Sequence, residues 1–166
     1  MNYKSILFFL GINSLIVSFF SVINILYSIY FSFYIGLNSY LITLVISLVI
    51  GFSFYYIGWN HSKDIILTDQ IIFVLMSFIL MPCLISIPYF LSIYDIGLLN
   101  SYFESVSGFT TTGFSTIQNI NNDDEPLLLW RSSSQWIGGL IFFNIVNPVD
   151  VRPDTDSKYA VKKHIL

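Results

Sequence analysis

Long apolar runs, separated by short polar segments, dominate the first part of the sequence. No Asp, Glu, Lys or Arg occurs between Lys4 and Lys63. A helix that spans a bilayer needs about 20 mostly apolar residues, so this interval is long enough for two such helices. The pattern predicts them at Ser5–Phe33 and Tyr40–Ile57, with a short turn at 34–39 between them.

The first predicted helix lies close to the N-terminus, where a secretory signal would also lie. Its apolar run reaches Phe33 without a small-residue cleavage site, whereas the apolar part of a signal peptide is only about 7–15 residues long. We therefore expect an uncleaved membrane helix. Asn13 and Asn24 interrupt its apolar surface, and we expect their side chains to form hydrogen bonds with neighbouring helices.

Two further helices are predicted after a short polar loop. Gln70–Tyr94 is apolar and contains Pro82 and Pro88, which membrane helices tolerate and which usually kink the axis. Leu127–Val146 follows Pro126, a residue that suits the first turn of a helix. This last helix is the weakest candidate for a span, because an arginine, three serines and a glutamine lie in its first half.

The segment 95–125 is too apolar for an open loop and too short for a span. Irregular backbone at membrane depth is tolerated only where it is buried in protein or lines a watery cavity. The remaining arrangement is a short helix that enters the membrane and turns back. Ser101 and Glu104 have the spacing of a capping box, which predicts a helix start near Tyr102 and an end near Phe109.

A polar loop of unusual composition follows, formed by Thr110, Thr111, Thr112, Gly113 and Phe114. A cation filter needs extended backbone whose carbonyl oxygens replace the water around the ion. Glycine permits the required backbone angles, threonine can add a hydroxyl oxygen, and we expect the phenylalanine to pack behind the loop and hold its width. The negative end of the short helix would favour a cation at this point.

Together these elements predict an all-α membrane protein. Two N-terminal transmembrane helices are followed by one unit of transmembrane helix, re-entrant pore helix, filter loop and transmembrane helix. The expected parts are a two-helix hairpin at 1–60, the membrane–pore–membrane repeat at 61–146 and a polar tail at 147–166.

Composition and charge narrow the class of protein. Of the 166 residues 10% are charged, 55% hydrophobic and 18% aromatic, whereas soluble domains are about a quarter charged. These values exclude a soluble domain and a disordered chain, and the missing basic surface excludes a nucleic-acid-binding protein. With one cysteine, no clustered histidines or carboxylates at ligand spacing and no phosphate-binding loop, we expect no enzyme, no cofactor and no transition-metal site.

The basic residues outside the predicted helices suggest an orientation. Lysine and arginine are absent from 34–39 and 95–125 and present near the N-terminus, in the 61–69 loop and in the tail. The positive-inside rule then predicts that both termini and the 61–69 loop are cytoplasmic. The segment 95–125 would face outward, with acids at Asp95, Glu104, Asp123, Asp124 and Glu125.

Two stretches resemble a known family. Residues 101–113, with the sequence SYFESVSGFTTTG, and 127–139, with LLLWRSSSQWIGG, resemble the first pore loop and the next helix of the Trk/Ktr/HKT potassium transporters, most closely the TrkH/TrkG branch. The resemblance implies that Thr111, Thr112 and Gly113 line the ion path with carbonyls toward K⁺. In this family a filter glycine accompanies K⁺ and a serine in the first loop accompanies Na⁺, so Gly113 favours K⁺ as the transported ion.

Family members carry four such repeats around one pore, and this sequence contains one. We expect the N-terminal part of a transporter in a bacterial inner membrane. A truncated gene, a frameshifted gene or a deliberately shortened chain would each explain the missing repeats. The resemblance implies membrane lipid and three kinds of protein partner: the remaining repeats, a second pore subunit in a homodimer, and a cytosolic nucleotide-binding regulatory subunit of the TrkA type. The alternatives are a non-transporting remnant, a small accessory membrane protein and a one-repeat homotetrameric channel.

Three charged sites have competing interpretations. Glu104 serves either as an ion ligand or, more simply, as a cap and packing group. Arg131 either pairs with filter-loop carbonyls or Glu104, as intramembrane charges usually have a function, or extends to the outer interface. The acids at 123–125 either attract cations by long-range steering or complement the positive end of the following helix.

Overall fold

The computed structural model describes residues 3–34, 36–59, 67–92, 96–117 and 125–146. Within these ranges the chain forms helices and no strand, which confirms the all-α prediction. The helices are α1 (Tyr3–Tyr30), α2 (Leu37–Gly58), α3 (Leu67–Phe90), α4 (Gly97–Phe109) and α5 (Glu125–Val146).

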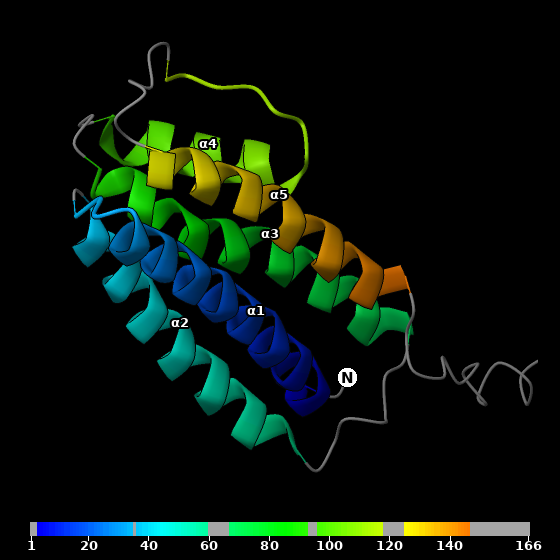
Figure 1. Cartoon of the computed structure of the whole chain (residues 1–166). Helices are drawn as coiled ribbons and strands as arrows, with labels where there is room; N and C mark the ends of the chain where they lie inside the picture. Colours follow the sequence, from blue (N-terminus) through cyan, green and yellow to red (C-terminus); the bar gives the residue numbers. More distant parts are fainter. Residues whose placement is uncertain (1–2, 35, 60–66, 93–95, 118–124, 147–166) are drawn as a thin grey trace, which may run out of the picture.

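Four of the helices lie roughly side by side, and the short α4 lies against one end of this bundle (Figure 1). Among the described residues α1, α2 and α3 are long and apolar enough to cross a membrane. The chain is therefore a membrane protein. The fourth predicted span, α5, is helical but is not among those three, as its polar first half suggested.

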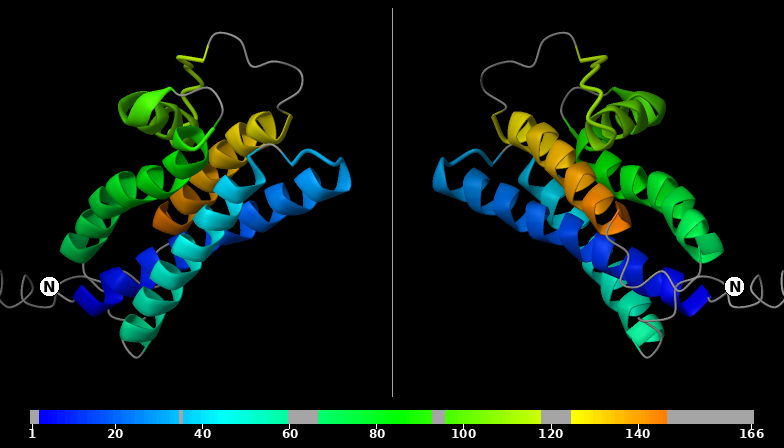
Figure 2. Two further views of the ribbon diagram at one scale, coloured as in Figure 1. Left: turned by 90° about the vertical axis from the view of Figure 1, so that its left-hand side faces the viewer. Right: turned by 90° about the vertical axis from the view of Figure 1, so that its right-hand side faces the viewer.

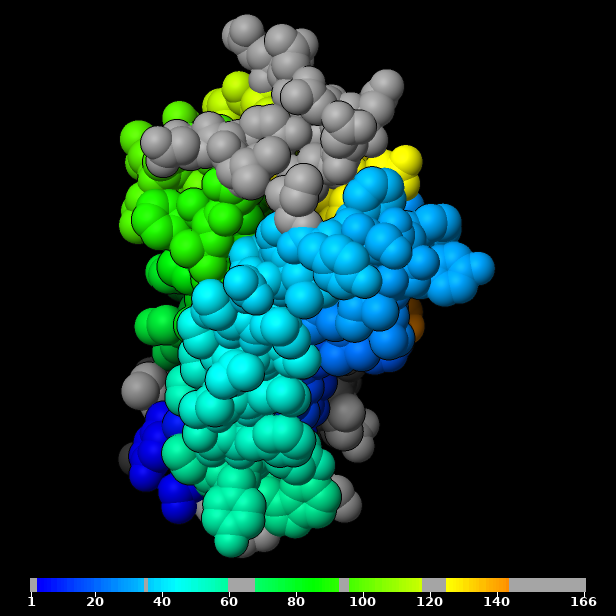
Figure 3. All heavy atoms as spheres, turned by 60° about the vertical axis from the view of Figure 1, so that its left-hand side comes forward, coloured from blue at the N-terminus to red at the C-terminus, as the bar shows by residue number. Residues whose placement is uncertain are grey.

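The outer surface of α2 is apolar, as expected for a surface that contacts lipid. Figure 3 shows α2 in cyan along one face of the molecule. Its exposed side chains there include large hydrophobic groups, among them Val45, Val49, Phe52 and Tyr56. Such a contiguous apolar face would not be stable in water, which agrees with its membrane assignment.

Small residues let α1 and α2 approach closely. A side chain at Gly11 would meet the backbone nitrogen of Tyr55 at 2.6 Å and the carbonyl oxygen of Gly51 at 2.9 Å. Ser18 and Ser47 share a hydrogen bond of 2.7 Å between their hydroxyls across the same interface. Membrane helices associate through such close packing and interhelical hydrogen bonds, because burial of apolar surface provides no driving force between them in lipid.

The asparagines of α1 connect it to the second half of the chain. Asn13 Nδ2 donates to Ser77 Oγ of α3 at 3.3 Å, and Asn24 Nδ2 donates to Ser133 Oγ of α5 at 3.1 Å. Both asparagines are buried. The prediction that they form interhelical hydrogen bonds is confirmed.

The prolines of α3 lie within the helix, as predicted. Pro88 supplies no N–H to the carbonyl four residues before it, which loosens the preceding turn. The buried Trp130 of α5 donates its indole N–H to the carbonyl of Ile85 in that turn, at 3.0 Å. This carbonyl is not the one that Pro88 leaves without its helical donor, which belongs to Leu84, but the bond fixes α5 against α3 next to the proline.

The predicted capping box is wrong. Helix α4 begins at Gly97, several residues before Tyr102, and no side chain caps its start. Ser101 Oγ donates within the helix to the Gly97 carbonyl at 2.7 Å, and the carboxyl group of Glu104 bonds the loop after the helix instead. The spacing is typical of a cap, but it also places both residues on one buried face of an uninterrupted helix.

Several predictions fall outside the described residues. They concern the polar tail at 147–166, most of the 61–69 loop, and the acids Asp95, Asp123 and Asp124. The division into three parts and the cytoplasmic placement of both termini stay predictions.

Candidate functional site

Helix α4 turns back along α3 and ends halfway down the bundle. Figure 2 shows it at the end of the molecule where α3 ends and α5 begins. Its last residue, Phe109, contacts Phe78 with ring centroids 5.3 Å apart, and Phe78 lies midway along α3. The loop that follows α4 thus starts near the middle of the bundle, as in a re-entrant segment.

Two glycines bring α4 and α5 into backbone contact. A side chain at Gly108 would collide with the hydroxyl of Ser134, and one at Gly138 would collide with the carbonyl group of Phe109. The end of α4 therefore rests directly on the backbone of α5, and the position of the loop depends on this contact.

The end of α4 has the hydrogen bonds of a Schellman motif. Thr112 N donates to the Ser107 carbonyl at 3.0 Å, and Thr111 N donates to the Gly108 carbonyl at 2.9 Å. Thr111 is the residue with left-handed backbone, at φ 57°. Glycine usually occupies this position, and a β-branched residue there is a rare and strained choice.

This turn separates the donors of the loop from its acceptors. The amides of Thr111, Thr112 and Gly113 all bond back to carbonyls of α4. Within the described chain no group donates a hydrogen bond to the carbonyl oxygens of Thr110, Thr111 or Thr112. These three carbonyls are the unpaired acceptors of the loop.

We expect Thr111→Gly to stabilise the fold, because glycine adopts the left-handed conformation without strain. The gain in the free energy of unfolding should be about 1 kcal/mol, the usual cost of one residue in that conformation. Unfolding in mixed detergent and SDS micelles measures it. A loss of stability would show that the Thr111 side chain contributes more than its backbone strain costs.

Gly113 also has positive φ, at 83°, and a side chain added there would meet no atom within 4 Å. Its carbonyl oxygen accepts a hydrogen bond of 2.8 Å from Arg131 Nη2. Of the interpretations left open for Arg131, the structure thus shows the pairing with a loop carbonyl. The Gly113 carbonyl therefore has a hydrogen-bond donor, unlike the carbonyls of Thr110, Thr111 and Thr112.

Glu104 holds the segment that leaves the loop. Its Oε1 accepts hydrogen bonds from Ser115 Oγ at 2.9 Å, from Thr116 Oγ1 at 3.0 Å and from the Thr116 backbone amide. Only 1% of the Glu104 surface is exposed. The loop is therefore fixed at both ends, by the Schellman motif before Gly113 and by this carboxyl group after it.

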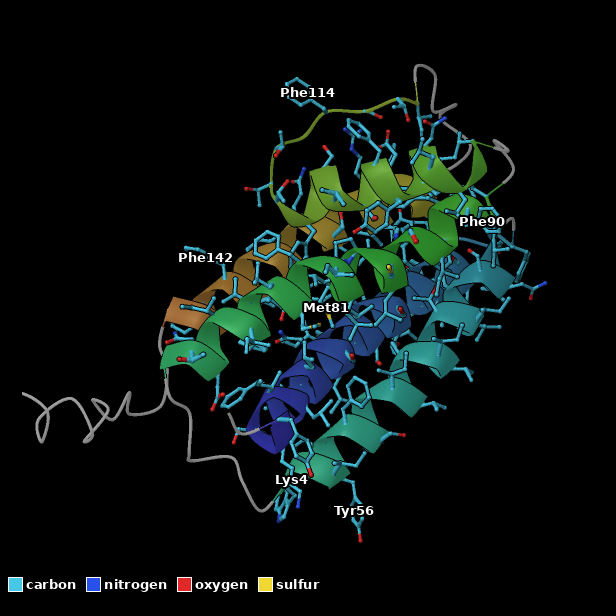
Figure 4. The ribbon with its side chains drawn as sticks, turned by 180° about the vertical axis from the view of Figure 1, so that it is seen from behind. Lys4, Tyr56, Met81, Phe90, Phe114 and Phe142 are labelled. Atoms are coloured by element: carbon cyan, nitrogen blue, oxygen red, sulfur yellow. The ribbon has the colours of Figure 1, made fainter. Side chains whose placement is uncertain are left out.

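Phe114 does not pack behind the loop. Its side chain is 69% exposed and points away from the helices (Figure 4). The backbone of Phe114 is the part that is held, since its carbonyl accepts a hydrogen bond from Ser107 Oγ at 2.6 Å. In this structure the prediction that the ring holds the width of the loop is wrong.

Glu125 lies in the first turn of α5, where a negative charge suits the helix dipole. It accepts a hydrogen bond of 2.7 Å from the Tyr27 hydroxyl of α1. Among the described residues no cluster of three His, Cys, Asp or Glu side chains could hold a metal ion.

Comparison with known proteins points to one family. The chain is 28% identical to an uncharacterized cation transporter of Methanocaldococcus jannaschii over 137 residues, which are 82% of this chain and 28% of that protein. It is 30% identical to the Trk system potassium uptake protein TrkI of Halomonas elongata over 84 residues, 51% of this chain and 17% of TrkI. These relatives support assigning the chain to the Trk-type potassium transporter family.

A third relative agrees with this assignment to the Trk-type family. The Trk system potassium uptake protein TrkG of Escherichia coli is 30% identical over 102 residues, 61% of this chain and 21% of TrkG. The chain thus spans between about a sixth and somewhat over a quarter of the length of the relatives it matches. No protein-family model matches the chain, and no solved structure does.

Sequence reasoning assigned no role to three residues that shape the loop after α4. Ser107 bonds the Phe114 carbonyl, while Gly108 and Gly138 permit the contact of α4 with α5. All three lie inside the two stretches that resemble the family. Glycines in otherwise good helices were the available signal, because glycine costs stability there unless close packing requires it.

Proposed function

We propose that this chain supplies one quarter of the K⁺ selectivity filter of a Trk-type uptake transporter. The observation that supports this most directly is the set of unpaired carbonyls at Thr110, Thr111 and Thr112. Carbonyl oxygens held in one place can replace the water shell of K⁺, which is the requirement for passage through a narrow filter.

The end of α4 favours a cation over an anion at the start of the loop. The C-terminal end of α4 carries a partial negative charge of about half an electron, and it ends at Thr110, next to the first unpaired carbonyl. The amides, which would attract anions, are turned back into the helix. Arg131 holds Gly113 in place, so in this proposal Gly113 acts through its backbone conformation and the preceding carbonyls contact the ion.

One loop cannot surround an ion. The proposal assigns the other loops to further segments of the same protein or to other subunits, with a second pore subunit and a nucleotide-binding regulatory subunit as partners in the bacterial inner membrane. A one-repeat homotetramer is a poorer candidate, because α5 is not among the helices apolar enough to span. A non-transporting remnant would lack coding sequence for further pore loops downstream, which DNA sequencing determines.

We expect Gly113→Ala and Gly113→Asp to abolish K⁺ uptake in bacteria that lack their own uptake systems, with the chain expressed together with the polypeptide encoded downstream. Any side chain strains the φ of 83° at this position, and the aspartate adds a carboxylate beside the ion path. Growth at low K⁺ and ⁸⁶Rb⁺ uptake are the measurements.

Gly97 provides a matched control. It also has positive φ, at 72°, and open space around it, but it lies at the opposite end of α4. Gly97→Ala should strain the backbone equally and leave uptake within about twofold of the original. Equal loss in both alanine variants, or full uptake by Gly113→Asp, would contradict the filter assignment. Uptake by the 166-residue chain alone would favour the homotetramer.

A further inference from the structure

A cavity of about 370 Å³ lies beside the end of α4, between α3 and α5. Three phenylalanines line it, one from each of these helices: Phe78, Phe109 and Phe142. Thr110 and Thr111 form the part of its wall nearest the loop. The cavity is thus apolar over most of its surface and polar at one end.

The polar end of the cavity lies at the C-terminal end of a helix. Helix α4 reaches its C-cap at Thr110, which lines the cavity, so the negative end of the helix dipole is at its wall. None of the residues that line the cavity carries a charge. With no competing positive group in the wall, the helix end favours a cation.

The aromatic residues suit a particular kind of cation. Phe78 and Phe109 meet edge to face, with an interplanar angle of 88°, and Phe142 projects from α5 near the end of α4 (Figure 4). Aromatic rings that line one space can attract a cation that keeps an apolar shell, as in cages that bind quaternary ammonium groups. Gly139 leaves room, since a side chain there would meet nothing within 4 Å.

We propose that this cavity binds a small organic cation of the quaternary ammonium type. A bare K⁺ would lose its water against mostly hydrocarbon walls, which supply too few oxygens to replace it. A lipid tail would fill the space without using the negative helix end. An organic cation satisfies both the rings and the charge. The proposal concerns binding and holds whether or not the chain conducts K⁺.

Tetraethylammonium is the probe, titrated calorimetrically into the purified chain in lipid nanodiscs. The expected result is saturable binding that weakens at least about tenfold in Phe142→Ala, which removes a ring, and in Gly139→Leu, which fills the cavity. A tenfold loss corresponds to about 1.4 kcal/mol, within the range of one desolvated cation–aromatic contact. Phe19→Ala is the matched control, because Phe19 on α1 is 62% exposed and Phe142 is 63% exposed.

A second comparison tests the role of the charge. Choline should bind more tightly than 3,3-dimethyl-1-butanol, which has the same shape without the charge. Equal affinity would overturn the proposal and identify an apolar groove for lipid tails. No saturable tetraethylammonium binding, or binding that Phe142→Ala and Phe19→Ala weaken equally, would overturn it as well. Neither result depends on K⁺ uptake, so failure of this proposal is distinguishable from failure of the filter assignment.

Discussion

Gly138→Ala should displace the end of α4 and cost about 1–3 kcal/mol or more in the free energy of unfolding, the range for overpacking in a tight interface. The added methyl group would occupy the place of the Phe109 carbonyl, which is backbone and cannot rotate away. Relief requires α4 to move off α5, and the loop of Thr110 to Phe114, which we propose as a filter, begins one residue later. We therefore expect K⁺ uptake to be lost together with stability.

The neighbouring glycine is a close control for this prediction. Gly139→Ala adds the same methyl group to the same helix where no atom lies within 4 Å. Replacing glycine within a helix by alanine should stabilise α5 slightly, by up to about 1 kcal/mol. Unfolding in mixed micelles and ⁸⁶Rb⁺ uptake measure both variants. Equal behaviour of the two variants would show that α4 does not rest on the backbone at Gly138.

The helices of this chain follow from its composition, and so the sequence predicts them well. Runs without charge have few alternatives to a membrane helix, because the backbone must satisfy its own hydrogen bonds in lipid. The predicted ends differ from the observed ones by a few residues: α1 ends at Tyr30 and not at Phe33, and α2 begins at Leu37 and not at Tyr40. Apolar periodicity does not specify where a helix stops.

The sequence predicted the extent of the loop after α4 but not its internal arrangement. Three threonines and a glycine after a short helix indicate which residues form the loop. They do not indicate that Thr111, and not Gly113, takes the left-handed position that ends α4. That choice depends on how far α4 extends before Gly108 and Phe109 meet α5, which is a long-range contact.

The hydrogen-bond partners of Glu104 were also not predictable from the sequence. Its spacing from Ser101 is that of a capping box, and a sequence offers no way to separate that use from another. The structure shows the carboxyl group bonded to Ser115 and Thr116, eleven and twelve residues along the chain. A loop has to fold back over its helix for this contact to form, and local spacing contains no information about that return.

Replacement of Glu104 should therefore release the far end of the loop. In Glu104→Ala the three donors lose their acceptor, and hydrogen bonds to a carboxylate are worth about 1.5–3 kcal/mol each. We expect a total loss of about 3 kcal/mol or more, since such terms do not add fully. Amide hydrogen exchange at Thr116 should accelerate, and K⁺ uptake should be lost.

Glu104→Gln keeps an oxygen that can accept the three hydrogen bonds and replaces only the second carboxylate oxygen. The amide oxygen can still accept the three bonds, but its NH₂ group then takes the place of Oε2, which has no partner among the described residues. A buried donor without an acceptor costs about 1–3 kcal/mol, so the glutamine should lie between the original and the alanine variant.

Glu125→Gln is the control, because Glu125 is exposed and makes its hydrogen bond to Tyr27 outside the loop. It should leave amide exchange at Thr116 unchanged. If Glu104→Ala also left that exchange unchanged, the carboxyl group would not hold the loop.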